Sequence, residues 1–316
     1  MFNSLAFLLA ILFIGFAHAS PDAFITNQLD NNVSVIDTDS MAVVKTITVT
    51  GKPAGVAVNP HLKQVYISTP ETGGFTVIDI NSLSVMDKVN AHGASLGITV
   101  DRSGKRVFVA DWYVNTVDVF ATDDFSLIKT LNVGKSPSGM VVSPDNHWLY
   151  VANRMDDSIS QINLKNYHLR NTTKVGLHPF GIAVSSDGER IYSANVESDD
   201  VTVLQQNHLK KIVDIKVGAR PYAVALAQND KLLLVTNQDD STVSVIDTQT
   251  FKALATIEVG EKPEGISTAA DDRHVLVANW MDGTVSVIDT EQLTVIKTIE
   301  AAEGSRAFGD FILRTR

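Results

Sequence analysis

Short runs of hydrophobic residues alternate with turn-forming residues along most of this chain. The stretch 275–299, VLVANWMDGTVSVIDTEQLTVIKTI, contains three such runs, VLVAN, TVSVID and TVIKTI, separated by segments that contain Asp. Runs of this length match β-strands, and Asp and Gly accept the backbone geometries of tight turns. No segment after residue 22 shows a sustained helical period. The pattern therefore predicts an all-β protein.

The first of these runs recurs at a constant spacing. Its copies begin at residues 23, 65, 107, 149, 191, 233 and 275, so each step is 42 residues and seven steps cover residues 23–316. A period of about 40–45 residues with several short strands in each repeat is typical of a β-propeller blade. The sequence predicts one domain over residues 20–316, a seven-bladed β-propeller of four-stranded blades.

The composition of the runs predicts their order within a blade. One run in each repeat is small and apolar, as at 139–142 and 181–184, and we expect it to be the inner strand, where the blades converge. Another run carries Lys, as at 296–299, which suits an outer strand because charge discourages pairing with other molecules. The first run of the chain resembles a second strand and the last, 307–313, an inner strand. We therefore expect the two ends of the chain to pair and close the ring.

The recurring motifs VSVIDT, LYVAN, IEVGEKPEG and SSDGERIY resemble those of the YVTN-repeat family of seven-bladed β-propellers, which includes the YncE-like exported bacterial proteins. The resemblance extends over residues 23–316. It implies the same fold, and it leaves the function open because the family includes scaffold, ligand-binding and enzyme-like modules. The second repeat departs from the pattern, since His92-Gly93 stands where other repeats have a Gly-x-x-Pro turn.

The charge, the cysteine content and the first residues of the chain restrict its possible partners and its cellular location. The chain has 26 basic and 36 acidic residues, a net charge of −10, which argues against wholesale binding to nucleic acid or anionic membranes. It has no Cys, and therefore no disulfide and no Cys-ligated metal or haem. An apolar run followed by Ala17-His18-Ala19 predicts a signal peptide over residues 1–19, with an uncleaved anchor as the alternative. We expect a periplasmic or secreted monomer with no membrane span after cleavage.

The repeat also predicts which loop residues share the mouth of the central channel. Two positions of each repeat lie where the inner strand begins: the residue just before the turn proline and the residue just after it. These positions supply five cations, Lys52, His178, Arg220, Lys262 and Arg306, and one acid, Glu264. Because a closed ring focuses these charges on its axis, they favour an anionic ligand. The alternative is a set of solvated loop charges, some of them paired with Glu264 or Glu261.

The loops after the second strands add aromatic and basic residues at the same face. Trp112, Trp280 and Arg154 each follow a recurrent Asn or Asp, and Tyr222 and Phe180 begin inner strands nearby. Aromatic and Arg side chains stack on flat ligands or nucleic-acid bases. The alternative is that each Trp packs over a neighbouring blade. The recurrent Asn itself is expected to be structural, at the end of a strand.

These observations favour an exported, non-enzymatic binding or scaffold protein that recognises an anionic ligand or protein partner at the channel mouth. Stacking of single-stranded nucleic acid on the Trp and Tyr side chains is the first alternative. The second alternative, implied by the family resemblance, is a lactonase-like enzyme or an accessory protein of a redox-cofactor pathway. The His residues are scattered and no catalytic motif is present, so we expect no metal site, catalytic residue or cofactor.

Overall fold

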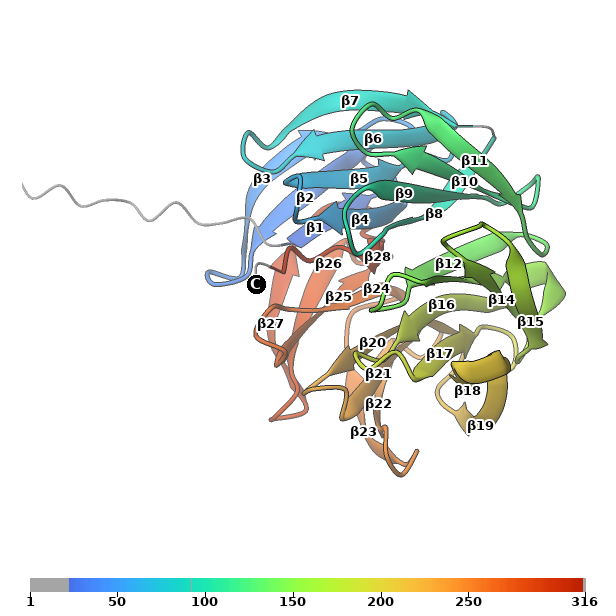
Figure 1. The fold of residues 1–316 in the computed structure, drawn as a ribbon. Helices are drawn as coiled ribbons and strands as arrows, with labels where there is room; N and C mark the ends of the chain where they lie inside the picture. The colour runs from blue at the N-terminus through green and yellow to red at the C-terminus, as the bar shows by residue number, and fades with distance from the viewer. Residues whose placement is uncertain (1–22, 92, 315–316) are drawn as a thin grey trace, which may run out of the picture.

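The computed structural model describes residues 23–91 and 93–314, and its strands form seven radial sheets around an axis (Figure 1). The all-β, seven-bladed architecture predicted from the 42-residue repeat is therefore confirmed. The blue N-terminal and red C-terminal strands lie next to each other in Figure 1, as ring closure requires. The predicted signal peptide and His92 lie outside the described residues.

Six blades consist of four consecutive strands, and blade 1 combines the two ends of the chain. The inner strands, from blade 1 to blade 7, are β28 (Phe308–Asp310), β4 (Gly55–Asn59), β8 (Ser95–Val100), β12 (Pro137–Val142), β16 (Pro179–Val184), β20 (Pro221–Ala227) and β24 (Pro263–Thr268). The second strands are β1 (Ala23–Asn27), β5 (Gln64–Ser68), β9 (Arg106–Asp111), β13 (Trp148–Asn153), β17 (Arg190–Asn195), β21 (Leu232–Asn237) and β25 (His274–Asn279).

The remaining strands follow in the same blade order. The third strands are β2 (Asn32–Asp37), β6 (Gly74–Asp79), β10 (Thr116–Ala121), β14 (Ser158–Asn163), β18 (Asp200–Gln205), β22 (Thr242–Asp247) and β26 (Thr284–Asp289). The outer strands are β3 (Ala42–Thr48), β7 (Ser84–Asn90), β11 (Leu127–Asn132), β15 (Leu169–Lys174), β19 (Lys210–Lys216), β23 (Ala253–Glu258) and β27 (Thr294–Glu300). Two short 3-10 turns, η1 (Arg154–Asp156) and η2 (Asn207–Leu209), complete the described chain.

The outer strand is the least buried strand of each blade, and the second strand is more buried than the inner strand in several blades. The second strands are buried on both faces, because each blade is covered by its two neighbours, whereas the outer strand β3 is mostly exposed. The inner strands need small residues because they approach each other closely. A Cβ atom at Gly97 would lie 1.9 Å from the carbonyl oxygen of Ser138 in the next blade, and one at Gly139 would lie 2.3 Å from that of Phe180. The predicted order of strands in a blade is confirmed.

The recurrent Asn residues hold the hairpins between second and third strands. Asn153 donates its side-chain amide to Ser158 and Ser160, five and seven residues later, at 3.2 and 2.9 Å. The same spacing recurs in four other blades, at Asn27, Asn195, Asn237 and Asn279. The structural role predicted for this position is confirmed. These bonds fix where each following loop leaves its blade.

The two ends of the chain close the ring, as predicted. The C-terminal segment runs antiparallel to β1, with Arg306 N–H donating to the Thr26 carbonyl at 2.8 Å and Phe24 N–H donating to that of Phe311 at 3.0 Å. Its regular strand β28 is shorter than the predicted 307–313 and pairs in parallel with β4 of blade 2, whereas the pairing with β1 consists of two single bridges, Ala23 with Ile312 and Asn27 with Ser305. Phe308, Phe311, Ile312 and Leu313 are all buried. The terminal segment therefore connects blade 1 to its neighbour through both backbone and side chains.

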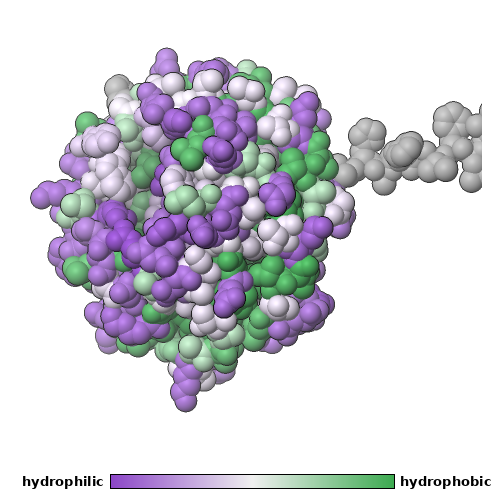
Figure 2. Space-filling view, turned by 180° about the vertical axis from the view of Figure 1, so that it is seen from behind, coloured by the Kyte–Doolittle hydropathy of each residue, from purple (hydrophilic) through white to green (hydrophobic). Residues whose placement is uncertain are grey.

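The surface of the ring is mixed. Figure 2 shows one face, where hydrophilic residues cover most of the area and hydrophobic residues form small patches between them. Within the described residues, no helix is long and apolar enough to cross a membrane.

Candidate functional site at the channel mouth

Four of the predicted cations occupy the same backbone position, which sets the direction of their side chains. Lys52, His178, Arg220 and Lys262 each precede a proline at or just before the start of an inner strand and adopt φ angles of 56°, 55°, 54° and 54°. Non-glycine residues adopt this left-handed conformation only where local bonds support it. Here the backbone N–H of His178 donates to Asp157 at 2.9 Å and that of Arg220 to Asp199 at 2.8 Å. The turns thus hold these side chains around the mouth.

Most of these rim cations are paired with acids. Arg220 contacts Glu197 at 2.8 Å, and Lys262 contacts Asp239 at 2.7 Å. Arg220 also lies 3.7 Å from Asp239, and His178 Nδ1 lies 3.9 Å from Glu197. The result is an alternating chain of basic and acidic side chains over blades 5 to 7. Because these side chains are partly exposed, each pair contributes about 0–1 kcal/mol to stability.

Glu197 and Asp239 were missed by the sequence analysis, which counted Glu264 as the one acid at the mouth. They occupy the second position after the recurrent Asn, where the other repeats have Leu29, Glu71, Tyr113, Met155 and Met281. The 42-residue register therefore contained the signal that would have found them. The mouth has a smaller net positive charge than the sequence analysis expected.

Arg306 and Tyr222 lie deeper, below the rim. Arg306 forms an ion pair with Glu264 at 2.8 Å, and its guanidinium also donates to the Tyr222 hydroxyl. Gln238 donates to the other oxygen of Glu264 at 2.8 Å. Burial raises the pKa of Glu264, and the positive charge of Arg306 opposes that shift. This cluster joins blades 6, 7 and 1 and forms part of the floor of the mouth.

Aromatic side chains fill the centre of the mouth. The Phe180 ring lies 4.1 Å from that of Tyr222, 5.1 Å from that of Phe308 and 6.4 Å from that of Trp112, measured between centroids. These four rings come from blades 5, 6, 1 and 3. Phe180, Tyr222 and Phe308 are almost fully buried, whereas Trp112 is partly exposed. Trp280 is separate, and its indole N–H lies 3.4 Å from the side-chain oxygen of Gln28.

Arg154 differs from the other cations of the mouth. It begins η1 after β13, and its guanidinium carbon lies 5.9 Å from the centre of the Trp112 ring and 5.7 Å from that of Phe180. Burial lowers the pKa of Arg154, and the nearby charges of Arg220 and Arg306 act in the same direction, whereas Tyr222 and Glu197 oppose the shift. An Arg side chain nevertheless remains ionised in a protein. Among residues 23–91 and 93–314 the guanidinium has no hydrogen-bonding or ion-pair partner, only the two rings.

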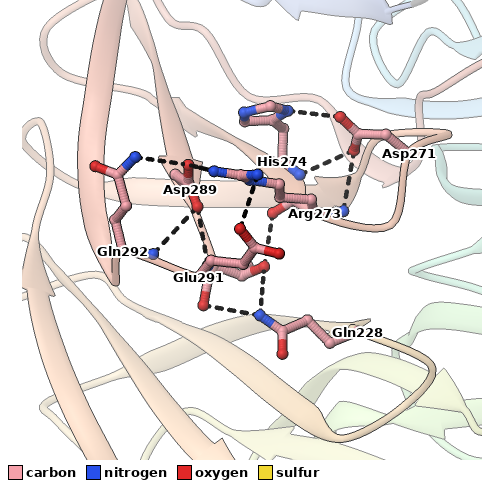
Figure 3. Close-up of polar contacts among 8 residues, drawn as sticks. Gln228, Asp271, Arg273, His274, Asp289, Glu291 and Gln292 are labelled. Atoms are coloured by element: carbon pink, nitrogen blue, oxygen red, sulfur yellow. Dashed lines mark hydrogen bonds and ion pairs between the residues drawn. The ribbon is translucent and has the colours of Figure 1, made fainter.

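A second cluster of charged side chains lies in blade 7, on the face of the ring opposite the channel mouth, and its groups are paired with one another. Arg273 contacts Asp289 at 2.6 Å and Glu291 at 2.7 Å, and His274 contacts Asp271 at 2.6 Å (Figure 3). The hydrogen bond from Arg273 lowers the pKa of Asp289 to about 2. Asp289 also accepts the N–H groups of Glu291 and Gln292 in its own turn, which is an Asx-turn role. The Figure 3 cluster is therefore structural.

No group of three or more potential metal-binding side chains occurs in the part of the chain that the structure describes. His178 is the one described histidine at the mouth, and its Nδ1 is buried without a hydrogen-bonding partner.

Comparisons with known proteins agree with the architecture. A family model described as "Lactonase, 7-bladed beta-propeller" matches residues 124–211, and one described as "Cytochrome D1 heme domain" matches residues 221–307. The chain is a seven-bladed β-propeller. Each match covers less than a third of it, and the narrower resemblance to the YVTN-repeat family stays a prediction. No curated protein matches the chain.

Several solved structures share the fold at low sequence identity. Kuenenia stuttgartiensis hydrazine synthase is 18% identical with a TM-score of 0.80, over 88% of this propeller and 99% of that chain. A functionally unknown protein from Desulfotomaculum acetoxidans is 11% identical with a TM-score of 0.82, over 94% and 100%. Dihydro-heme d1 dehydrogenase NirN in complex with DHE is 16% identical with a TM-score of 0.70, over 91% and 74%. At these identities the likeness concerns the fold alone.

Proposed function

We propose that this propeller is a binding protein that recognises an anionic ligand, or an anionic group of a partner, at the channel mouth. The observation that carries the proposal is the partly buried Arg154 guanidinium, which forms no hydrogen bond or ion pair with the described residues and interacts with the Glu197 carboxylate only at longer range. Removing a charge from water without a partner is costly, so such a group favours an incoming anion. The planar guanidinium can donate two parallel hydrogen bonds to a carboxylate or phosphate.

Trp112 adds a second requirement for the ligand. Its ring lies beside Arg154 and is partly exposed, so a flat or apolar part of the ligand can stack there while its anionic group meets the guanidinium. Arg220, Lys262 and Arg306 are neutralised by their own carboxylate partners, and we assign them to shaping the site. Arg154 and Trp112 are therefore the two direct contacts that the proposal names.

The family model described as "Cytochrome D1 heme domain", which matches residues 221–307, would suggest a haem ligand. The described residues of the mouth do not fit a haem. Phe180, Tyr222 and Phe308 pack against one another across the axis, and a planar group of that size would have to displace them. Stacking of nucleic acid on Tyr222 meets the same obstacle, since this ring is buried. Neither ligand enters the proposal.

Binding of benzoate and of inorganic phosphate, measured by isothermal titration calorimetry, tests the proposal. We expect Arg154→Gln to weaken binding about 10-fold to 100-fold, because a hydrogen bond to a charged group contributes about 1.5–3 kcal/mol. The matched control is Arg170→Gln, which removes another Arg stacked on a Trp, 4.8 Å from the Trp148 ring, outside the mouth. Unchanged affinity in Arg154→Gln, or no binding of either anion to the natural protein, would overturn the proposal.

A further inference from the structure

Large apolar side chains stand exposed on the loops that surround Arg154. Tyr113 is 76% exposed, Val114 56%, Met155 53% and Leu177 51%. Isolated exposed apolar residues are ordinary, but a contiguous group bordered by polar residues marks an interaction surface. We call these four residues the apolar rim.

Hydrogen bonds link the loops that carry the apolar rim across blades 3, 4 and 5. The backbone N–H of Ser136 donates to the Asn115 side chain of blade 3 at 2.9 Å, and its carbonyl accepts from Arg154 of blade 4 at 3.1 Å. On the other side, the N–H of His178 donates to Asp157 of blade 4 at 2.9 Å. The loops that carry the rim are therefore linked to one another in sequence around the mouth.

The backbone of the loops that carry the rim is also held in place. The Asp111 carboxylate accepts the N–H groups of Tyr113 and Val114 at 2.9 and 3.2 Å. The N–H of Met155 donates to the Lys135 carbonyl at 3.1 Å. A surface that is already ordered loses less conformational entropy when it binds, which favours affinity.

The position of the rim relative to the charges indicates what it would bind. At the loop position of Tyr113 and Met155, blades 5 and 6 have the acids Glu197 and Asp239. Arg154, which forms no ion pair with the described residues, thus lies between an apolar side and a side whose cations are already paired with these acids. Such a surface suits one anionic group flanked by apolar ones, and disfavours a polyanion such as nucleic acid.

We propose that the apolar rim docks an extended protein segment that carries one carboxylate side chain between large apolar residues, with the carboxylate on Arg154. This inference rests on the proposed anion site and names its occupant. A small ligand on Arg154 and Trp112 would leave Tyr113 and Leu177 uncovered, whereas a peptide chain crossing blades 3 to 5 would bury them. The carboxylate fits the Arg154 guanidinium by charge complementarity.

The test is binding to an array of short fluorescent peptides, each with a central Glu flanked by Leu, Phe or Tyr, beside a matched array with Gln. We expect the Glu peptides to bind at least about tenfold more tightly than their Gln counterparts, which is about 1.4 kcal/mol. The double variant Tyr113→Ser/Met155→Ser should lose peptide binding and keep benzoate binding. The matched control, Leu62→Ser/Leu254→Ser, removes two exposed apolar residues away from the mouth and should leave both unchanged.

The outcomes separate this inference from the proposed function. Benzoate binding without peptide binding, or peptide binding that survives the rim substitutions, overturns the docking surface and leaves the anion site standing. If the natural protein binds neither benzoate nor the peptides, both the docking surface and the anion site are overturned. Preferential binding of oligo-dT, or of vesicles containing phosphatidylserine, through the rim would assign it to a nucleic acid or a membrane and overturn the peptide.

Discussion

Phe311→Ala tests the idea that the C-terminal segment holds the whole ring together. Phe311 is fully buried, and its carbonyl accepts the N–H of Phe24 in the first strand. The substitution keeps this backbone bond and removes only the ring. Truncation of a buried Phe to Ala costs about 3–5 kcal/mol because the cavity left behind does not close completely.

That cost is large relative to the stability of the protein. Each of the four buried side chains of the closing segment contributes about 1.5–3 kcal/mol by leaving water, roughly 6–12 kcal/mol together. Net stabilities of folded proteins are about 5–15 kcal/mol. Deleting residues 308–316 is therefore expected to unfold the protein entirely, and Phe311→Ala is the graded version of that experiment.

Urea unfolding followed by both tryptophan fluorescence and far-UV circular dichroism measures the effect. We expect one shared transition whose midpoint falls by an amount equivalent to about 3–5 kcal/mol, with an unchanged slope. The control is Ile296→Ala, on the exposed outer strand β27, which should change stability by less than about 1 kcal/mol. An unchanged midpoint in Phe311→Ala, or a separate early transition confined to one part of the signal, would refute closure as the source of cooperativity.

Two further substitutions test individual ion pairs by the same unfolding assay. Asp289→Asn should destabilise the fold by about 1 kcal/mol at neutral pH, because it removes the charge paired with the partly exposed Arg273. Arg273 lowers the pKa of Asp289 from 3.8 to about 2. The ionised carboxylate therefore stabilises the fold fully at pH values above its pKa in the unfolded chain, and this stabilisation is lost as the pH falls through the folded pKa. The difference in stability between the variant and the natural protein should vanish as the pH falls towards 2. A difference that persists there would contradict the pairing. Glu264→Gln should cost about 3–5 kcal/mol because it leaves Arg306 buried beside no carboxylate, and the double variant with Arg306→Met should recover part of the loss. Equal stability of Glu264→Gln and the natural protein would count against a buried charge pair.

The sequence alone determined the all-β class, the seven blades, the order of strands within them and the closure by the two ends. These features depend on local patterns, such as strand-length apolar runs, turn residues and inner glycines such as Gly139, repeated every 42 residues. A pattern repeated in constant register specifies a ring because every blade meets its neighbour in the same way. The sequence also indicated which loops share the mouth.

Only the tertiary structure decided which of those loop residues are free to bind. Arg220 and Lys262 form ion pairs with acids from the loops, whereas Arg154 forms no ion pair with the described residues and lies over two aromatic rings. Tyr222 is buried by side chains from other blades. Burial and pairing of a charge depend on groups that are distant in the chain, and electrostatic energy depends on their separation in space. The fold follows from the residues that recur in every repeat. The proposed site at the channel mouth depends on the side chains that differ between repeats.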